Sequence, residues 1–117
     1  MLALRTNNEP AERAFLVGIE LPGAERWAVK DSLEELALLA RTAGAEVSGE
    51  AIARRRSLDP ATGVGKGKAE EIARSVREGG IGLVLFDEDL TPAQLRNLQD
   101  AVGARVLDRT ELILSVF

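Results

Sequence analysis

The sequence predicts an α/β domain with a mainly parallel sheet of four strands, flanked by helices and assembled from βαβ units. Short apolar runs alternate along the chain with amphipathic helical segments, which is the pattern of a parallel sheet with helical crossovers. The length of 117 residues fits a single domain. The first apolar run, residues 14–21, is too continuous for a half-exposed strand, so we expect it at the buried centre of the sheet.

The first half of the chain is expected to form one βαβ unit. Pro22 ends the first strand. Asp31 and Glu34 have the spacing of a capping box, which predicts that a helix begins there, and Gly44 is expected to end it. The second strand is predicted over 46–53. The apolar residues at helical spacing in the helix are Leu33, Leu36, Ala37 and Ala40.

The third strand is expected to follow a second helical crossover. A glycine-containing linker over 57–68 leads into a helix that Gly79 and Gly80 close. The strand itself is predicted over 82–86, an apolar run followed directly by acidic residues. The apolar face of the preceding helix consists of Ala69, Ile72, Ala73 and Val76.

A third helix has the clearest start signal in the sequence. Thr91 and Gln94 form a second capping box, and Pro92 occupies the first helical position. Gly103 is expected to end this helix. A short fourth strand is predicted over 105–107.

The domain boundaries follow from these elements. We expect a flexible N-terminus over 1–12, the α/β domain over 13–109, and the start of a further helical segment over 110–117. The last segment is compatible with a strand or a helix, and we favour the helix because residues 108–110 can cap it.

Composition excludes several classes of protein. The chain has no Cys and no His, which excludes disulfides, thiolate nucleophiles, zinc sites of imidazole or thiolate, and Ser-His-Asp triads. No apolar run approaches the ~20 residues of a membrane span, and no secretory signal is recognisable, so we expect a cytoplasmic protein. Aromatic residues make up only 3% of the chain, so stacking platforms for nucleic acid are essentially absent and any such contact is expected through phosphates and shape.

A glycine and lysine stretch between the second strand and the next helix lies where phosphate-binding loops occur. Its candidate phosphate-binding residues are Gly63, Gly65, Lys66, Gly67 and Lys68. The spacing does not match a Walker A loop, because the earlier glycine is missing and Gly67 or Ala69 follows each lysine instead of Ser or Thr. The alternatives are a loop that holds a phosphate and a mobile linker with solvated lysines.

Acidic residues follow the third strand, at the edge where open α/β sheets bind ligands. Asp87 and Asp89, with Glu20 from the end of the first strand, provide the oxygen ligands that Mg²⁺ accepts. The competing interpretation, which we favour, is that the acids solvate the turn and lie near the positive end of the helix that starts at Thr91. The metal site is therefore the weaker alternative.

The charge is distributed unevenly along the chain. Residues 54–68 hold five basic residues against a single acid and carry a net charge of +4, whereas the whole chain carries −4, so the remaining residues carry −8. Arginines and glycine-flanked lysines suit phosphate groups. The alternatives are an RNA contact and an ordinary solvated face. The basic residues of this segment are Arg54, Arg55, Arg56, Lys66 and Lys68.

Several blocks of the sequence recur together in one known family. They are residues 13–20, Trp27, 31–36, 40–45, 59–62, 65–68 with Glu70 and Glu71, 86–87, 90–98, and 108–110 with Ile113 and Leu114. The most specific blocks are Gly-Lys-Gly-Lys over 65–68 and Thr-Pro-Ala-Gln-Leu-Arg-Asn-Leu over 91–98, whereas Arg54–Arg56 match only loosely. With these blocks, in the order of that family and from about residue 13 to the last residue, the chain resembles the N-terminal domain of the HflX family of GTPases.

The resemblance implies a factor that binds the large ribosomal subunit and rRNA and is linked to rescue or splitting of stalled ribosomes under stress. It also implies that a helical hairpin and a G domain follow this domain, and that GTP and Mg²⁺ bind there. The G-domain motifs are missing from this sequence, so no cofactor and no GTP hydrolysis are expected in it. Two alternatives remain: a nucleotide-binding domain that uses the glycine loop with Mg²⁺, and a domain that only packs on the G domain and modulates its rate.

The C-terminal segment leads to one further expectation. Its apolar residues would be covered by the hairpin that the resemblance implies, so without it they are expected to form an exposed patch and to promote self-association. These residues are Leu112, Ile113, Leu114, Val116 and Phe117.

Overall fold

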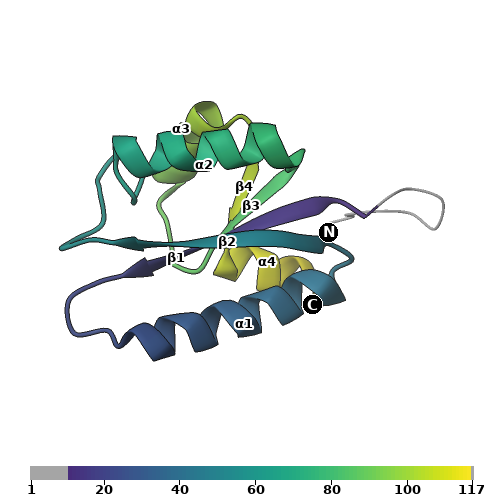
Figure 1. Cartoon of the computed structure of the whole chain (residues 1–117), viewed down its shortest axis with the longest axis horizontal. Coiled ribbons are helices and arrows are strands. Elements are labelled where there is room, and N and C mark those ends of the chain that lie inside the picture. Colours follow the sequence, from purple (N-terminus) through teal and green to yellow (C-terminus); the bar gives the residue numbers. More distant parts are fainter. Residues whose placement is uncertain (1–10, 117) are drawn as a thin grey trace.

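The computed structural model describes residues 11–116 and consists of four strands that alternate with four helices along the chain (Figure 1). The strands pair in the order β2-β1-β3-β4, and every pair is parallel. The predicted α/β class and parallel sheet are therefore confirmed. The elements are β1 (Arg13–Glu20), α1 (Arg26–Thr42), β2 (Glu46–Arg54), α2 (Lys66–Gly79), β3 (Leu83–Phe86), α3 (Pro92–Val102), β4 (Arg105–Asp108) and α4 (Arg109–Val116).

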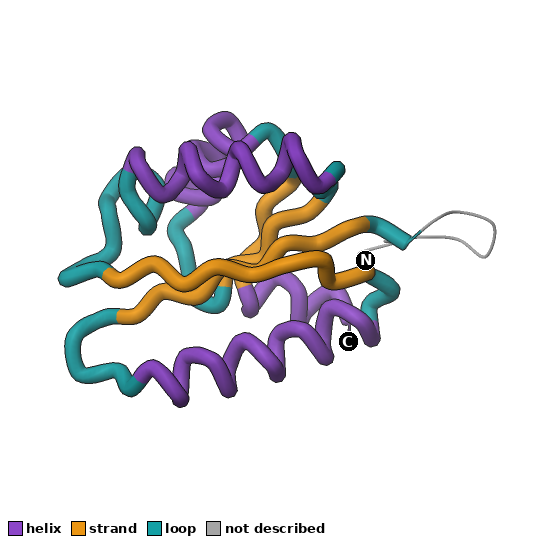
Figure 2. Tube along the Cα trace, in the orientation of Figure 1, coloured by secondary structure: helices purple, strands orange, loops and turns teal. Residues whose placement is uncertain are grey.

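Helices cover both faces of the sheet. Helices α2 and α3 lie on one face, and α1 and α4 lie on the other (Figures 1 and 2). Because β2 lies on one side of β1 and β3 on the other, right-handed crossovers bring α1 and α2 to opposite faces. The segments predicted over 1–12, as a flexible N-terminus, and over 110–117, as the start of a helical segment, lie partly outside the described residues. Within the described part of the N-terminal segment, Glu12 pairs with Arg105 at 2.9 Å.

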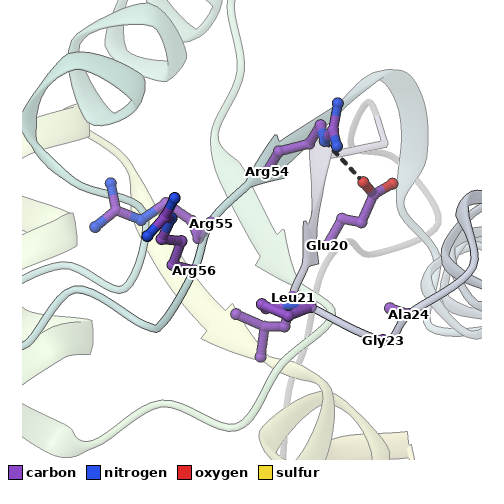
Figure 3. A pocket seen from close by; sticks show the side chains of 8 residues that line it. Glu20, Leu21, Gly23, Ala24, Arg54, Arg55 and Arg56 are labelled. Atoms are coloured by element: carbon purple, nitrogen blue, oxygen red, sulfur yellow. Dashed lines mark ion pairs between the residues drawn. The ribbon is translucent and has the colours of Figure 1, made fainter.

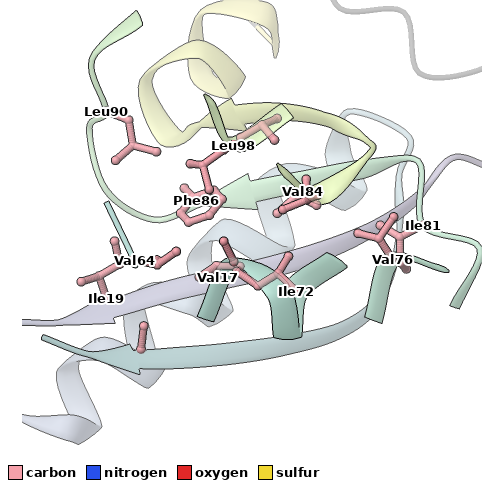
Figure 4. Close-up of a cluster of buried hydrophobic side chains, with 14 residues drawn as sticks. Val17, Ile19, Val64, Ile72, Val76, Ile81, Val84, Phe86, Leu90 and Leu98 are labelled. Carbon is pink, nitrogen blue, oxygen red and sulfur yellow. The ribbon is translucent and has the colours of Figure 1, made fainter. Parts of the chain in front are cut away.

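The alternation of side chains along the central strands creates two cores. Val17 and Ile19 of β1 point to the α2 and α3 side, whereas Ala14 and Leu16 point to the α1 and α4 side. Figure 4 shows the first core, in which Phe86 is fully buried. Since both faces of β1 and β3 are covered, these strands have the continuous apolar sequences expected of central parallel strands.

Helix α1 begins earlier than the capping-box pattern predicts. The helix starts at Arg26, and Asp31 lies inside it, so the predicted cap at Asp31 and Glu34 is wrong. Glu25 occupies the N-cap position without a side-chain hydrogen bond. The apolar stripe extends back to Val29, which is 9% exposed, so burial of this side chain favours an extra helical turn over the local cap.

The boundaries of α3 and the start of α4 agree with their sequence signals. In α3, Thr91 Oγ1 accepts a hydrogen bond from Gln94 N at 3.1 Å, and Gln94 Oε1 accepts one from Thr91 N at 2.9 Å. Gly103 ends this helix in the left-handed conformation. The helix predicted after Asp108 is also present, because Asp108 Oδ1 accepts from Glu111 N at 2.9 Å and caps α4.

Helix α4 packs on the sheet and buries one residue of the predicted apolar patch. Leu112 is fully buried in the core beneath α1, so it does not contribute to a patch. Leu114 is 73% exposed, and Ile113 is half-buried. The side chain of Val116 and the whole of Phe117 lie outside the described residues. Among residues 11–116, no helix has the length and apolar character needed to cross a membrane.

Candidate functional site

The carboxyl ends of the four parallel strands share one edge of the sheet, which is where open α/β sheets bind ligands. The last residues of β1 and β2, Glu20 and Arg54, are register partners. The loop after β1 leads to α1 on one face and the loop after β2 leads to α2 on the other, so the loops diverge. Between them lies a cleft of about 390 Å³. It is lined by Glu20, Leu21, Pro22, Gly23, Ala24, Arg54, Arg55 and Arg56 (Figure 3).

Glu20 joins three elements at one wall of this cleft. Its carboxylate accepts a hydrogen bond from Arg26 Nε and pairs with Arg54 Nε at 3.0 Å. The hydrogen bond from Arg26, together with the charges of Arg26 and Arg54, lowers the pKa of Glu20 despite partial desolvation. The same bond raises the pKa of Arg26. Glu20 therefore remains ionised and fixes the start of α1 against the end of β2.

Arg55 and Arg56 point away from Glu20 (Figure 3). Arg55 Nε donates to the Ser57 carbonyl at 3.3 Å, and its guanidinium lies 4.0 Å from the Asp59 carboxylate. Within the described part of the chain, Arg56 forms no ion pair, and it is exposed. The cleft therefore offers a net positive charge with one uncommitted guanidinium.

The glycine loop before α2 is fixed by hydrogen bonds. Asp59 Oδ1 accepts from Ala61 N at 2.8 Å and Thr62 N at 2.9 Å, and these bonds lower the pKa of Asp59. Asp59 and Gly63 also pair through their backbones. Helix α3 holds the loop from outside, since Gln94 Nε2 donates to the Asp59 carbonyl at 2.8 Å. This network does not support the alternative of a mobile linker.

Gly65 and Gly67 have different roles in this segment. Gly65 has a φ of +85°, and a Cβ there would lie 2.6 Å from Arg55 Nη1. Glycine is therefore required at this position, and its small size lets Arg55 approach the start of α2. Gly67 lies within α2 with open space around it, so no packing reason for a glycine exists there.

The structure separates the two lysines from each other and from the arginines. Lys66 and Lys68 belong to the first turn of α2, not to the preceding linker as predicted. Lys66 lies beside Thr62 and Ala101, over a hollow between α2 and α3. Lys68 pairs with Glu71 at 3.1 Å and lines a hollow next to β2. The basic segment therefore spreads over three surfaces, and only the arginines meet in one cleft.

The acidic residues considered for a magnesium site have other partners. Glu20 binds two arginines, Asp87 pairs with Arg109 at 2.6 Å, and Asp89 accepts from Thr110 Oγ1 at 2.6 Å. Among residues 11–116, no group of three or more acidic side chains is placed to hold a metal ion. The nearby Glu88 has a raised pKa, because it is desolvated and lies close to two aspartates.

The residues present do not fit GTP with Mg²⁺. The loop that resembles a phosphate loop uses its own backbone donors, because Gly65 N donates to Thr62 Oγ1 at 3.0 Å and Gly63 N donates to the Asp59 carbonyl at 2.8 Å. The carboxylates of Glu20, Asp87 and Asp89 are bound to arginine or threonine side chains, so they do not offer free ligands for Mg²⁺. We derive no step of GTP chemistry from this domain.

Two features of this edge were missed by reasoning from the sequence. Arg109 links three elements, since it contacts Asp87, Ser32 Oγ at 2.7 Å and Glu35 at 2.9 Å. Trp27 is 70% exposed in the first turn of α1. The absence of Trp27 from the apolar stripe of α1 is a sequence signal that could have shown its exposure.

The chain is similar to the N-terminal parts of known GTPases. A family model described as "GTP-binding GTPase N-terminal" matches residues 30–117. GTPase HflX of Flavobacterium psychrophilum is 39% identical over 106 residues, which cover 91% of this chain and 26% of that protein. GTPase HflX of Escherichia coli strain K12 is 44% identical over 87 residues, which cover 74% of this chain and 20% of that protein.

The fold also has a solved counterpart. A GTP-binding protein from the hyperthermophilic archaeon Sulfolobus solfataricus, solved in complex with GDP, aligns with a TM-score of 0.66 at 21% identity. The alignment covers 90% of this chain and 30% of that structure. The chain spans about a quarter of the length of the curated relatives named above. The chain belongs to the GTP-binding GTPase N-terminal family and corresponds to the N-terminal domain of HflX GTPases.

Proposed function

We propose that this domain docks an HflX-type GTPase on the large ribosomal subunit, where its arginine cleft contacts rRNA phosphates. The observation that supports this most directly is the clustering of Arg54, Arg55 and Arg56 around one cleft at the carboxyl edge of the sheet. Arginine guanidinium groups match phosphate oxygens in charge and geometry. The chain outside residues 54–68 is strongly acidic, so an RNA backbone would be attracted to the basic residues of this segment and repelled by the rest.

The lysine segment contributes to docking in a different way in this proposal. Lys66 and Lys68 lie on other surfaces, so they would contact different phosphates of a large, curved RNA. Gly63 and Gly65 shape the loop around Arg55, whereas Gly67 allows RNA to approach the first turn of α2.

The parts of the protein beyond this domain would supply the GTP chemistry. GTP and Mg²⁺ would bind in the G domain that HflX relatives carry, and that domain and a helical hairpin would be partners of this one. The proposed setting is the cytoplasm, with a role in rescue or splitting of stalled ribosomes under stress. Recognition of ribosomal RNA would be the task of the present domain.

The test uses the full-length protein sedimented with large ribosomal subunits over a range of salt concentrations. Each phosphate contact changes the slope of log affinity against log salt by about 0.7 for single-stranded and about 0.9 for duplex nucleic acid. The double variant Arg55→Ala and Arg56→Ala should weaken binding and reduce the slope by roughly 1.4 to 1.8. Arg77→Ala is the matched control, because Arg77 is an exposed arginine in the last turn of α2.

The lysines are tested in the same way. Replacement of Lys66 and Lys68 by alanine should reduce binding and the salt slope if α2 contacts RNA. If the arginine variant binds subunits as tightly as the Arg77→Ala control at every salt concentration, the cleft is not the contact and the proposal is wrong.

A further inference from the structure

The only tryptophan of the chain lies exposed beside the arginine cleft. Trp27 is 70% exposed and, with Leu38 and Leu114, is one of the exposed large hydrophobic side chains of the described residues. Its neighbour Arg26 binds Glu20 in the cleft wall, and Ala24, three residues earlier, lines the cleft. The tryptophan therefore lies within about one helical turn of the cleft. The low aromatic content of the sequence argued against a stacking surface, but one exposed tryptophan in the right place is sufficient for one base.

The two ends of this surface differ in charge. At the cleft, Arg56 forms no ion pair within residues 11–116 and Arg55 is only partly engaged, so this end suits a phosphodiester. Around Trp27, the exposed Glu25 and Asp31 outweigh the single exposed Lys30, so this end does not attract phosphate groups. An uncharged base can still lie against an indole ring there, because stacking does not depend on net charge.

A nucleotide chain likewise offers two kinds of group, charged phosphates and uncharged bases. A duplex presents its phosphates and keeps its base faces stacked inside, so it could use the arginines but not the tryptophan. A single strand can use both at once. Loops, bulges and ends of structured RNA offer such unpaired bases.

We propose that Trp27 and the arginine cleft together bind an unpaired segment of RNA, in which one base stacks on Trp27 while other phosphates of the same strand contact Arg55 and Arg56. This inference rests on the proposed function and specifies the kind of RNA recognised. Loss of one stacked base corresponds to a decrease in affinity of about 5- to 150-fold.

Tryptophan fluorescence gives a direct test, because Trp27 is the sole tryptophan of the 117-residue chain. Helices of this chain cover both hydrophobic cores, so the 117-residue chain itself is the protein used in the titration. Three probes are titrated: a single-stranded oligoribonucleotide of about eight nucleotides, a duplex RNA of the same length, and inorganic polyphosphate. We expect the single strand to quench the emission, whereas the duplex and polyphosphate leave it nearly unchanged.

Variants separate the two parts of the surface, with binding followed by the anisotropy of a labelled single strand. Trp27→Leu should weaken binding by at least about 5-fold and leave the salt slope unchanged. Arg56→Ala should reduce the salt slope by about 0.7 and leave the quenching at saturation intact. Trp27→Phe should retain part of the affinity, and Arg77→Ala should behave as wild type.

The failure of this inference can be distinguished from failure of the proposed function. If duplex and single strand bind equally and Trp27→Leu has no effect, the inference is wrong, and ribosome docking through the arginines stands. If no short RNA binds but the arginine variant of the full-length protein no longer binds the large subunit, the Trp27 inference is wrong and docking through the arginines stands. If no short RNA binds and the arginine variant still sediments with large subunits, the Trp27 inference and the docking proposal are both wrong.

Discussion

Replacement of Arg109 by alanine should strongly destabilise the domain. The Arg109 guanidinium contacts the Asp87 carboxylate at 2.6 Å, Ser32 Oγ at 2.7 Å and Glu35 at 2.9 Å. The Asp87 side chain is only 6% exposed, so the variant would leave a nearly buried carboxylate without its cation. Burial opposes the charged form of Arg109, but the hydrogen bonds and charges of Asp87 and Glu35 together outweigh it and raise the pKa of Arg109.

The magnitude follows from the burial of each partner. Removal of one member of a buried ion pair costs about 3–5 kcal/mol, and the 26% exposure of Arg109 puts this pair near the lower limit. The pair with Glu35, which is 65% exposed, adds at most about 1 kcal/mol. We therefore expect a loss of about 3 kcal/mol in the free energy of unfolding and a decrease of roughly 12 °C in Tm.

Urea denaturation followed by far-UV circular dichroism measures this loss. The double variant Arg109→Ala with Asp87→Asn should recover about 1–2 kcal/mol, because the uncompensated charge is then gone. Arg77→Ala should remain within about 0.5 kcal/mol of wild type, as expected of an exposed side chain. A loss below 1 kcal/mol for Arg109→Ala, or no recovery with Asp87→Asn, would refute the assignment of Arg109 as a clamp.

Four further predictions concern other parts of the fold. Burial raises the pKa of Glu88, so the neutral carboxyl is the form that the folded domain favours. The contribution of Glu88 to stability is therefore present at low pH and is lost as pH rises through its folded-state pKa. Glu88→Gln should raise Tm at pH 7 and reduce the pH dependence of Tm. Gly65→Ala should destabilise by about 1–2 kcal/mol, because the residue has a φ of +85° and its Cβ would meet Arg55. By contrast, Gly67→Ala should be neutral or stabilising by up to about 1 kcal/mol in the same urea titration. Thr91→Ala should cost about 1 kcal/mol through loss of the α3 cap, and equal stability to wild type would contradict it.

The two capping boxes explain why some boundaries were predictable and others were not. At Thr91 the local signal and the packing agree, and the helix begins where the sequence indicates. At Asp31 they conflict, because the helix gains burial of Val29 by beginning earlier. A cap contributes about 1 kcal/mol, whereas burial of a valine side chain contributes about 1.5–3 kcal/mol, so packing determines the start of α1.

The candidate site was predictable as a set of residues but not as an arrangement. The basic segment is visible in the sequence, and Arg54 to Arg56 do meet at one cleft. Lys66 and Lys68 are two positions apart on a helix, so their side chains differ by roughly 200° around its axis and cannot share a phosphate. The sequence pattern placed both lysines in the linker before the helix, so it could not predict this separation.

Two clamps at the same edge of the sheet converge on α1. Glu20 ties the first turn of this helix to β2 through Arg26, and Arg109 ties the following turn to β3 and α4 through Ser32. These contacts join residues far apart in the sequence, so local patterns do not predict them. Because α1 is held at both turns, the backbone at Trp27 has a defined position relative to the arginine cleft. A preorganised surface of this kind loses less conformational entropy on binding, so both clamps would favour the proposed RNA contact.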